Sequence, residues 1–133
     1  MGAGRRDATA AERELLARYV EATERGDGDA IAELLRAAAR FTMPPEPVLV
    51  VGRDEIVRSW VEGGFGADWF GRMRCVVTRA NQQPAVAVYL RRPGDDRYRA
   101  FALDVLRIED GEVAEVTTFG ARLFSAFGLP LEL

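Results

Sequence analysis

The sequence predicts an α+β fold in which three N-terminal helices pack on a strongly curved, mostly antiparallel sheet. Apolar residues recur with the period of a helix in the first half of the chain, whereas strand-like runs separated by short turns fill the second half. The length of 133 residues suits one core, and no repeat or linker divides it. We therefore expect a single domain over residues 1–133.

The first two helices are predicted from capping and periodicity. Thr9 and Glu12 have the spacing of a capping box. The apolar residues that follow at helical spacing are Leu15, Leu16, Tyr19 and Val20. Gly26 interrupts the pattern, and Asp27 or Asp29 caps a second helix. The predicted apolar stripe of this second helix consists of Ile31, Leu34, Leu35 and Ala38.

The middle of the chain passes from strand to helix to loop. Arg40–Met43 is predicted as a short strand that enters a proline-rich loop, and Val48–Val51 as a second strand. A third helix follows Gly52, and its predicted buried face consists of Ile56, Val57, Trp60 and Val61. The glycine-rich segment GGFGADWFG is predicted to be a loop at the rim of any cavity.

The second half predicts a four-stranded antiparallel meander. Its strand-like runs are RMRCVVTRA, PAVAVYLRR, RYRAFALDVLRIE and EVAEVTTF, and the turns between them are ANQQ, PGDD and EDGE. The tail GARLFSAFGLPLEL predicts a short helical turn. We expect this turn to pack Leu123, Phe124 and Phe127 against the body of the domain.

Composition excludes several classes of function. The net charge of −3 and the lack of a dense basic run argue against direct nucleic-acid binding. No apolar stretch approaches the ~18 residues that cross a membrane. The N-terminal stretch MGAGRRDATAAERE has no apolar segment of the secretory kind, so we expect a cytoplasmic protein.

The residue inventory restricts the chemistry further. The chain contains no histidine, which excludes catalysis and metal binding that require it. Its single cysteine, Cys75, lies in an apolar run and is expected to be a buried small hydrophobe. We expect no metal and no cofactor. Any enzyme would have to rely on carboxylates, tyrosine, arginine and the shape of a pocket.

One aspartate stands in the apolar stretch FALDVLRIEDGEV. Alternation along the strand places Asp104 on one side with Ala100, Ala102, Leu106 and Ile108. The small alanines leave room beside the carboxyl group, which favours a cavity. The alternative is an aspartate at a wet edge, or one paired with an arginine such as Arg91 or Arg107.

The opposite side of the same strand carries Phe101, Leu103 and Val105. A monomer that exposed this strip would carry an unusual hydrophobic patch. We therefore expect a homodimer through the outer face of the sheet.

The order of elements, with ARYVEATERGDGDAIAELL at the front, resembles the NTF2-like superfamily in its SnoaL-like branch over essentially the whole chain. More specifically, the chain resembles the C-terminal SnoaL-like domain of actinobacterial extracytoplasmic-function sigma factors. The segments that carry this likeness are RFTMPPEPVLVVGRDEIV, TRANQQPAVAVYLRRPG, FALDVLRIEDGEVAEVTTF and LFSAFGLP. Ala38 departs from the pattern, because such domains often carry an acid before the first strand.

The superfamily includes ketosteroid isomerase, and the resemblance implies roles for three residues. Tyr19 and Asp104 match the two oxyanion-hole donors of the isomerase, where an apolar site keeps the aspartic acid neutral. Met43 matches the general base and has no proton chemistry. We expect a pocket formed by Tyr19, Met43, Trp60, Ala102 and Asp104. Tyr19 and Asp104 would be catalytic hydrogen-bond donors only if the chain is an enzyme.

Three functions remain open at this point. The favoured one is a ligand-binding, regulatory domain for a small apolar molecule with a carbonyl or phenol, in contact with a sigma factor or polymerase. The second is a cyclase, isomerase or hydrolase that acts on a polyketide-like or terpenoid substrate. Glu62 and Asp68 would then be candidate bases. The third is a dimerising scaffold with a vestigial cavity.

Overall fold

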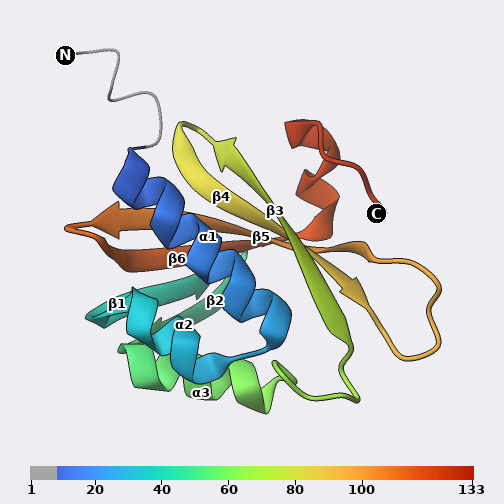
Figure 1. Cartoon of the computed structure of the whole chain (residues 1–133), viewed down its shortest axis with the longest axis horizontal. Coiled ribbons are helices and arrows are strands. Elements are labelled where there is room, and N and C mark those ends of the chain that lie inside the picture. The colour runs from blue at the N-terminus through green and yellow to red at the C-terminus, as the bar shows by residue number, and fades with distance from the viewer. Residues whose placement is uncertain (1–8) are drawn as a thin grey trace.

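The helices pack against one face of a bent, six-stranded sheet in the computed structural model, which describes residues 9–133 (Figure 1). The elements are α1 (Ala10–Arg25), α2 (Gly28–Leu34), β1 (Leu35–Met43), β2 (Glu46–Val51), α3 (Arg53–Glu62), β3 (Arg72–Ala80), β4 (Gln83–Arg91), β5 (Arg99–Glu109), β6 (Glu112–Gly120) and the 3₁₀ turns η2 (Ala121–Leu123) and η3 (Ser125–Phe127). The strand order is β2-β1-β6-β5-β4-β3. Only the β1–β6 pair among these is parallel. The predicted α+β fold is confirmed.

The predicted helix starts are confirmed by their caps. The Thr9 hydroxyl accepts a 3.0 Å hydrogen bond from the backbone N–H of Glu12, and α1 ends at Gly26 in a left-handed conformation. Asp27 caps α2 by accepting a 3.0 Å hydrogen bond from the backbone N–H of Ala30. Each cap satisfies a backbone donor that the first turn of a helix leaves without a partner.

The predicted stripe of the second helix was wrong in its second half. Helix α2 ends at Leu34, and Leu35 and Ala38 belong to β1. At the start of β1, Leu35 pairs with Val113 of β6, whereas pairing with β2 begins at Arg40. Pairing with β6 therefore outweighs the helical pattern of these side chains. Val61 was also placed wrongly on the buried face of α3. It is 50% exposed, because it lies beside Gly28, which has no side chain to cover it.

An irregularity in β5 changes which residues share a face. Val88 of β4 pairs with Ala102, but Tyr89 pairs with Ala100, so Phe101 is an extra residue at this point. Ala100 therefore packs with Tyr89 on the outer face, whereas Ala102 stays on the face of Asp104. The prediction that both alanines flank Asp104 was wrong for Ala100.

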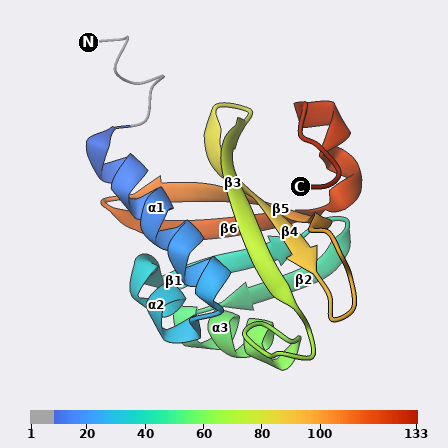
Figure 2. The ribbon, with the colours of Figure 1, turned by 45° about the vertical axis from the view of Figure 1, so that its right-hand side comes forward.

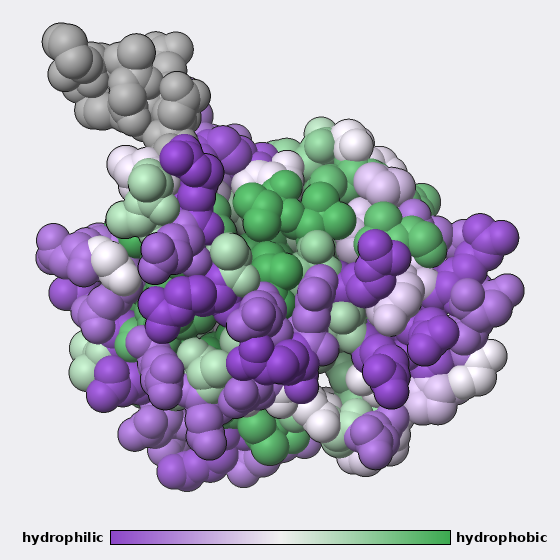
Figure 3. All heavy atoms as spheres, viewed as in Figure 1, coloured by the Kyte–Doolittle hydropathy of each residue, from purple (hydrophilic) through white to green (hydrophobic). Residues whose placement is uncertain are grey.

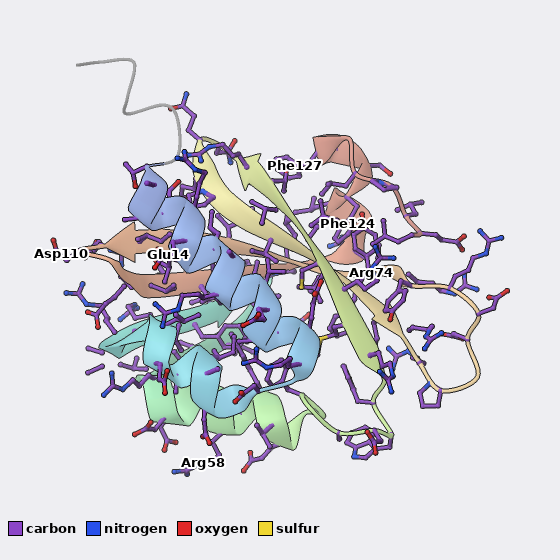
Figure 4. All side chains as sticks on the ribbon, in the orientation of Figure 1. Glu14, Arg58, Arg74, Asp110, Phe124 and Phe127 are labelled. Atoms are coloured by element: carbon purple, nitrogen blue, oxygen red, sulfur yellow. The ribbon has the colours of Figure 1, made fainter. Side chains whose placement is uncertain are left out.

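The C-terminal turns cover the outer face of the sheet. Phe124 is fully buried against Tyr89, Leu103 and Val105, and Phe127 packs beside it (Figure 4). Figure 2 shows α1 and these turns on opposite sides of β3 and β4. The predicted packing of Phe124 and Phe127 is confirmed, whereas the predicted exposed strip was wrong, because the tail buries Leu103 and Val105. The strip therefore gives no reason for a homodimer, and the oligomeric state stays a prediction.

The surface of the domain is hydrophilic over its first two helices and more apolar over part of the sheet (Figure 3). Hydrophilic side chains cover α1 and α2, while apolar side chains gather over β3 and β4 (Figure 3). Within residues 9–133, no helix combines the length and the apolar character needed to cross a membrane. Residues 1–8, on which the localisation prediction partly rests, lie outside the described residues.

Candidate functional site

A cavity of about 500 Å³ lies between the helices and the concave face of the sheet. Its walls are mainly apolar, and their aromatic side chains besides Tyr19 are Phe41, Trp60, Phe65, Phe70, Phe101 and Phe119. Trp60 contacts Phe41 edge to face, with ring centroids 5.4 Å apart. Met43 and Phe101, which are 37% and 38% exposed, are the most exposed apolar side chains of the lining and mark its opening. The volume falls within the usual range for small-molecule pockets.

A polar cluster interrupts the apolar lining at Asp104. The hydroxyl of Tyr19 donates to Oδ2 of Asp104 at 3.0 Å, and the hydroxyl of Thr118 donates to Oδ1 at 2.7 Å. Tyr19 on α1 is 0% exposed and Asp104 on β5 is 8% exposed. Both oxygens of one buried carboxyl group therefore have a hydroxyl partner.

Thr118 is a member of this cluster that sequence reasoning missed. The tight turn pairs Glu109 with Glu112, and counting back from it would place Asp104 opposite Thr117. A register shift between Arg107 and Ile108 instead pairs Asp104 with Thr118. The alternation of β6 alone would not have identified the partner, because a one-residue shift exchanges the two faces of a strand.

Burial dominates the electrostatics of the cluster. Loss of solvent raises the pKa of Asp104, and the hydrogen bonds from Thr118 and Tyr19 oppose that rise. Burial and the neighbouring Asp104 raise the pKa of Tyr19 well above its ordinary value. Burial also raises the pKa of the nearby Cys75 thiol, which is only partly buried in the main core rather than fully enclosed as expected. The cluster thus favours neutral forms.

The alternative of an ion pair at Asp104 is wrong. Arg107 pairs with Glu109 and Glu115, and the Arg91 guanidinium lies over the Tyr98 ring at 5.4 Å from its centroid. Within the described part of the chain, no arginine lines the cavity.

The structure brings the five predicted pocket residues to one cavity, since Tyr19, Met43, Trp60, Ala102 and Asp104 all line it. Their role in binding stays a prediction. Glu62 and Asp68 are exposed, and among residues 9–133 Asp104 is the only carboxylate in the lining. Within the same residues, no three cysteine, aspartate or glutamate side chains lie together in a way that could hold a metal ion.

A family model described as a SnoaL-like domain matches residues 16–116. The chain belongs to the SnoaL-like domain family. This SnoaL-like domain is 38% identical over 118 residues to the ECF RNA polymerase sigma factor SigG of Mycobacterium tuberculosis. The match covers 88% of this chain and 31% of the sigma factor, so the domain spans about a third of the length of that relative. The predicted resemblance to such sigma factors is confirmed.

Solved structures show the same fold. An NTF2-like protein of unknown function from Burkholderia xenovorans superimposes with a TM-score of 0.68 at 15% identity, covering 82% of this SnoaL-like domain and 81% of that chain. A proposed ketosteroid isomerase from Kribbella flavida gives a TM-score of 0.64 at 26% identity, and the match covers 84% of this domain and 78% of that chain. A proposed polyketide cyclase from Sinorhizobium meliloti gives a TM-score of 0.58 at 22% identity, and the match covers 79% of this domain and 93% of that chain. The predicted NTF2-like fold is therefore confirmed.

Proposed function

We propose that this SnoaL-like domain binds a small, flat, largely apolar molecule with a carbonyl or phenol oxygen, and that binding serves a regulatory or sensing role. The observation that carries the proposal is the Tyr19–Asp104–Thr118 cluster within an otherwise apolar cavity. An aromatic wall provides area for a flat ligand, and a few placed polar groups fix its orientation.

The cluster suits either kind of ligand oxygen. A protonated Asp104 can donate its hydrogen to a carbonyl, and burial favours this protonated form by raising the pKa of Asp104. A phenol can instead donate its own hydrogen to an oxygen of Asp104, because a carboxyl group offers about four lone-pair positions. Tyr19 and Thr118 occupy only part of this capacity.

Two features favour a regulatory domain over an enzyme. One relative is an ECF RNA polymerase sigma factor, which supports a role in transcription, contact with a sigma factor or polymerase, and a cytoplasmic location. In addition, abstraction of a proton beside a carbonyl needs a base within reach. Met43 offers only a thioether at the matching position, and in the described lining the sole carboxylate is Asp104, which the cluster already engages.

The second candidate is an enzyme that isomerises, cyclises or hydrolyses a polyketide-like or terpenoid substrate. Its support is the structural likeness to a proposed ketosteroid isomerase at 26% identity. The Tyr19–Asp104 pair could stabilise an oxyanion, but the reaction would require a base from outside the described cavity lining.

Calorimetric titration with three matched naphthalenes tests the proposal. The probes are 2-naphthol, 2-acetylnaphthalene and 2-methylnaphthalene, which share a flat body and differ in one polar group. We expect all three to bind, with the naphthol and the ketone several-fold tighter, since a neutral hydrogen bond contributes about 0.5–1.5 kcal/mol. Failure of all three to bind would overturn the proposal.

A further inference from the structure

The hydrogen-bond directions determine what the cluster offers to a ligand. A hydroxyl group has one hydrogen to donate, and Tyr19 and Thr118 both direct theirs at Asp104. When Asp104 is ionised, the cavity side of the cluster therefore presents lone pairs only. An ionised cluster cannot donate to a carbonyl without breaking one of these bonds, but it can accept a hydrogen bond from a ligand.

The ionised carboxylate also lacks a counterion. None of the arginines among the described residues lines the cavity, and the groups that contact Asp104 are neutral hydroxyls. A buried carboxylate without a paired cation has a high free energy. A ligand that supplies the cation would therefore bind more tightly, because the ion pair offsets this cost.

The walls suit the same kind of ligand. The negative faces of aromatic rings attract cations, and such contacts strengthen where water is excluded. Seven aromatic side chains, including Tyr19, line this cavity around the single carboxylate of its described lining. We propose that the cavity binds organic ammonium ions, with the charged nitrogen beside Asp104 and the apolar body against the aromatic walls. This inference rests on the proposed function, because it assigns a second class of ligand to the same cavity.

The groups around Asp104 make binding depend on pH in one direction. The titratable groups that face it are Tyr19 on α1 and Cys75 on β3, and burial raises the pKa of both, so they stay neutral at mildly alkaline pH. Glu24 on α1 contacts the backbone N–H of Cys75 and is exposed to solvent. Since burial also raises the pKa of Asp104, an ammonium ion must displace a proton from it into solvent at low pH. Ammonium binding should therefore strengthen as the pH rises.

Fluorescence of Trp60, a cavity residue, provides the readout once the second tryptophan is removed by Trp69→Phe. The probes are N,N-dimethylbenzylamine, which is protonated near neutral pH, and its neutral isostere isobutylbenzene. From about pH 5 to about pH 8 we expect the amine to gain roughly tenfold in affinity and isobutylbenzene to stay constant. If the amine binds no tighter than isobutylbenzene at the higher pH, this inference is overturned but the proposed function is not. If neither compound binds, the proposed function fails as well.

Three variants assign the effect to Asp104. In Asp104→Asn, which keeps the size but removes the charge, the amine should lose its advantage over isobutylbenzene. The matched control is Asp110→Asn, which removes the same charge at the exposed β5–β6 turn and should change neither affinity (Figure 4). If Asp104→Asn does not fold, Thr118→Val provides the test. It removes a bond that lowers the pKa of Asp104, so the rise in amine affinity should shift to higher pH. An unshifted curve would contradict the inference.

Discussion

The hydroxyl of Tyr19 lies 3.0 Å from Oδ2 of Asp104, although 85 residues separate the two in the sequence. Helix α1 supplies the tyrosine and β5 supplies the aspartate, so their contact exists only when the helix packs on the concave face of the sheet. The polar cluster of the cavity is therefore a product of tertiary packing. Its chemistry can be probed through stability as well as through binding.

The stability of the domain should depend on pH through Asp104. Burial raises the pKa of Asp104 in the folded state above its ordinary value of about 3.9, so the folded chain retains a proton that the unfolded chain has lost. Stability should therefore fall as the pH rises from the unfolded to the folded pKa, by about 1.4 kcal/mol for each unit between them. Urea unfolding of the wild type and Asp104→Asn should show the wild type losing stability relative to the variant as pH increases. A difference that is the same at every pH would contradict this prediction.

Tyr19→Phe should weaken the binding of 2-naphthol and 2-acetylnaphthalene a few-fold, and Asp104→Ala should do so as well. Each removes a hydrogen-bonding group of the cluster, a loss of about 0.5–1.5 kcal/mol. The matched control is Tyr89→Phe, because the Tyr89 hydroxyl donates a 2.7 Å bond to the carbonyl of Pro130 on the far side of the sheet. Calorimetry should find unchanged affinity in this control, and an equal loss in both tyrosine variants would argue against a role for the cluster.

Because Phe101 is an extra residue in β5, the alanines on either side of it face opposite sides of the sheet, and larger side chains there should affect ligand affinity differently. Ala102→Leu adds a side chain inside the cavity beside Asp104 and should reduce ligand affinity roughly tenfold or more by occupying space. Ala100→Leu makes the same change on the outer face and should leave affinity unchanged. Titration of both variants with 2-methylnaphthalene compares them directly, and equal losses would contradict the assigned faces.

The domain should not isomerise a 5-ene-3-ketosteroid at an appreciable rate. Tyr19 and Asp104 can polarise a carbonyl, but proton transfer also needs a base, and Met43 cannot serve. Absorbance of the conjugated product measures the reaction. Turnover that disappears in Tyr19→Phe would make the enzyme the better proposal, with Glu62 and Asp68 as the first residues to examine.

The C-terminal turns should contribute strongly to stability. Phe124 is fully buried and contacts the Tyr89 ring edge to face, so Phe124→Ala should cost about 3–5 kcal/mol of unfolding free energy. The variant also uncovers the apolar outer face and should self-associate more than the wild type. Chemical denaturation and light scattering measure the two effects. A loss as small as that of Leu131→Ala, which changes an exposed side chain, would show that the turns are not part of the core.

The local features of this protein can be predicted from its sequence alone. The caps at Thr9 and Asp27, the stop at Gly26 and the four strands of the meander follow from interactions within a few residues, and the structure contains all of them. The SnoaL-like family could also be predicted, because the segments that carry the resemblance extend over most of the chain. Tyr19 and Asp104 were identified as partners through this resemblance rather than through any local pattern.

The features that depend on pairing between distant segments arise only when the whole domain is folded. An extra residue in β5, Phe101, turned Ala100 away from the cavity. An extra residue in β6, Ala114, placed Thr118, not Thr117, opposite Asp104. Pairing with β6 extended β1 back to Leu35 against its helical pattern, and the C-terminal turns buried Leu103 and Val105. The periodicity of a sequence records which side chains avoid water. It does not record where a strand gains an extra residue or which segment covers a face, because these depend on the summed packing of the whole domain.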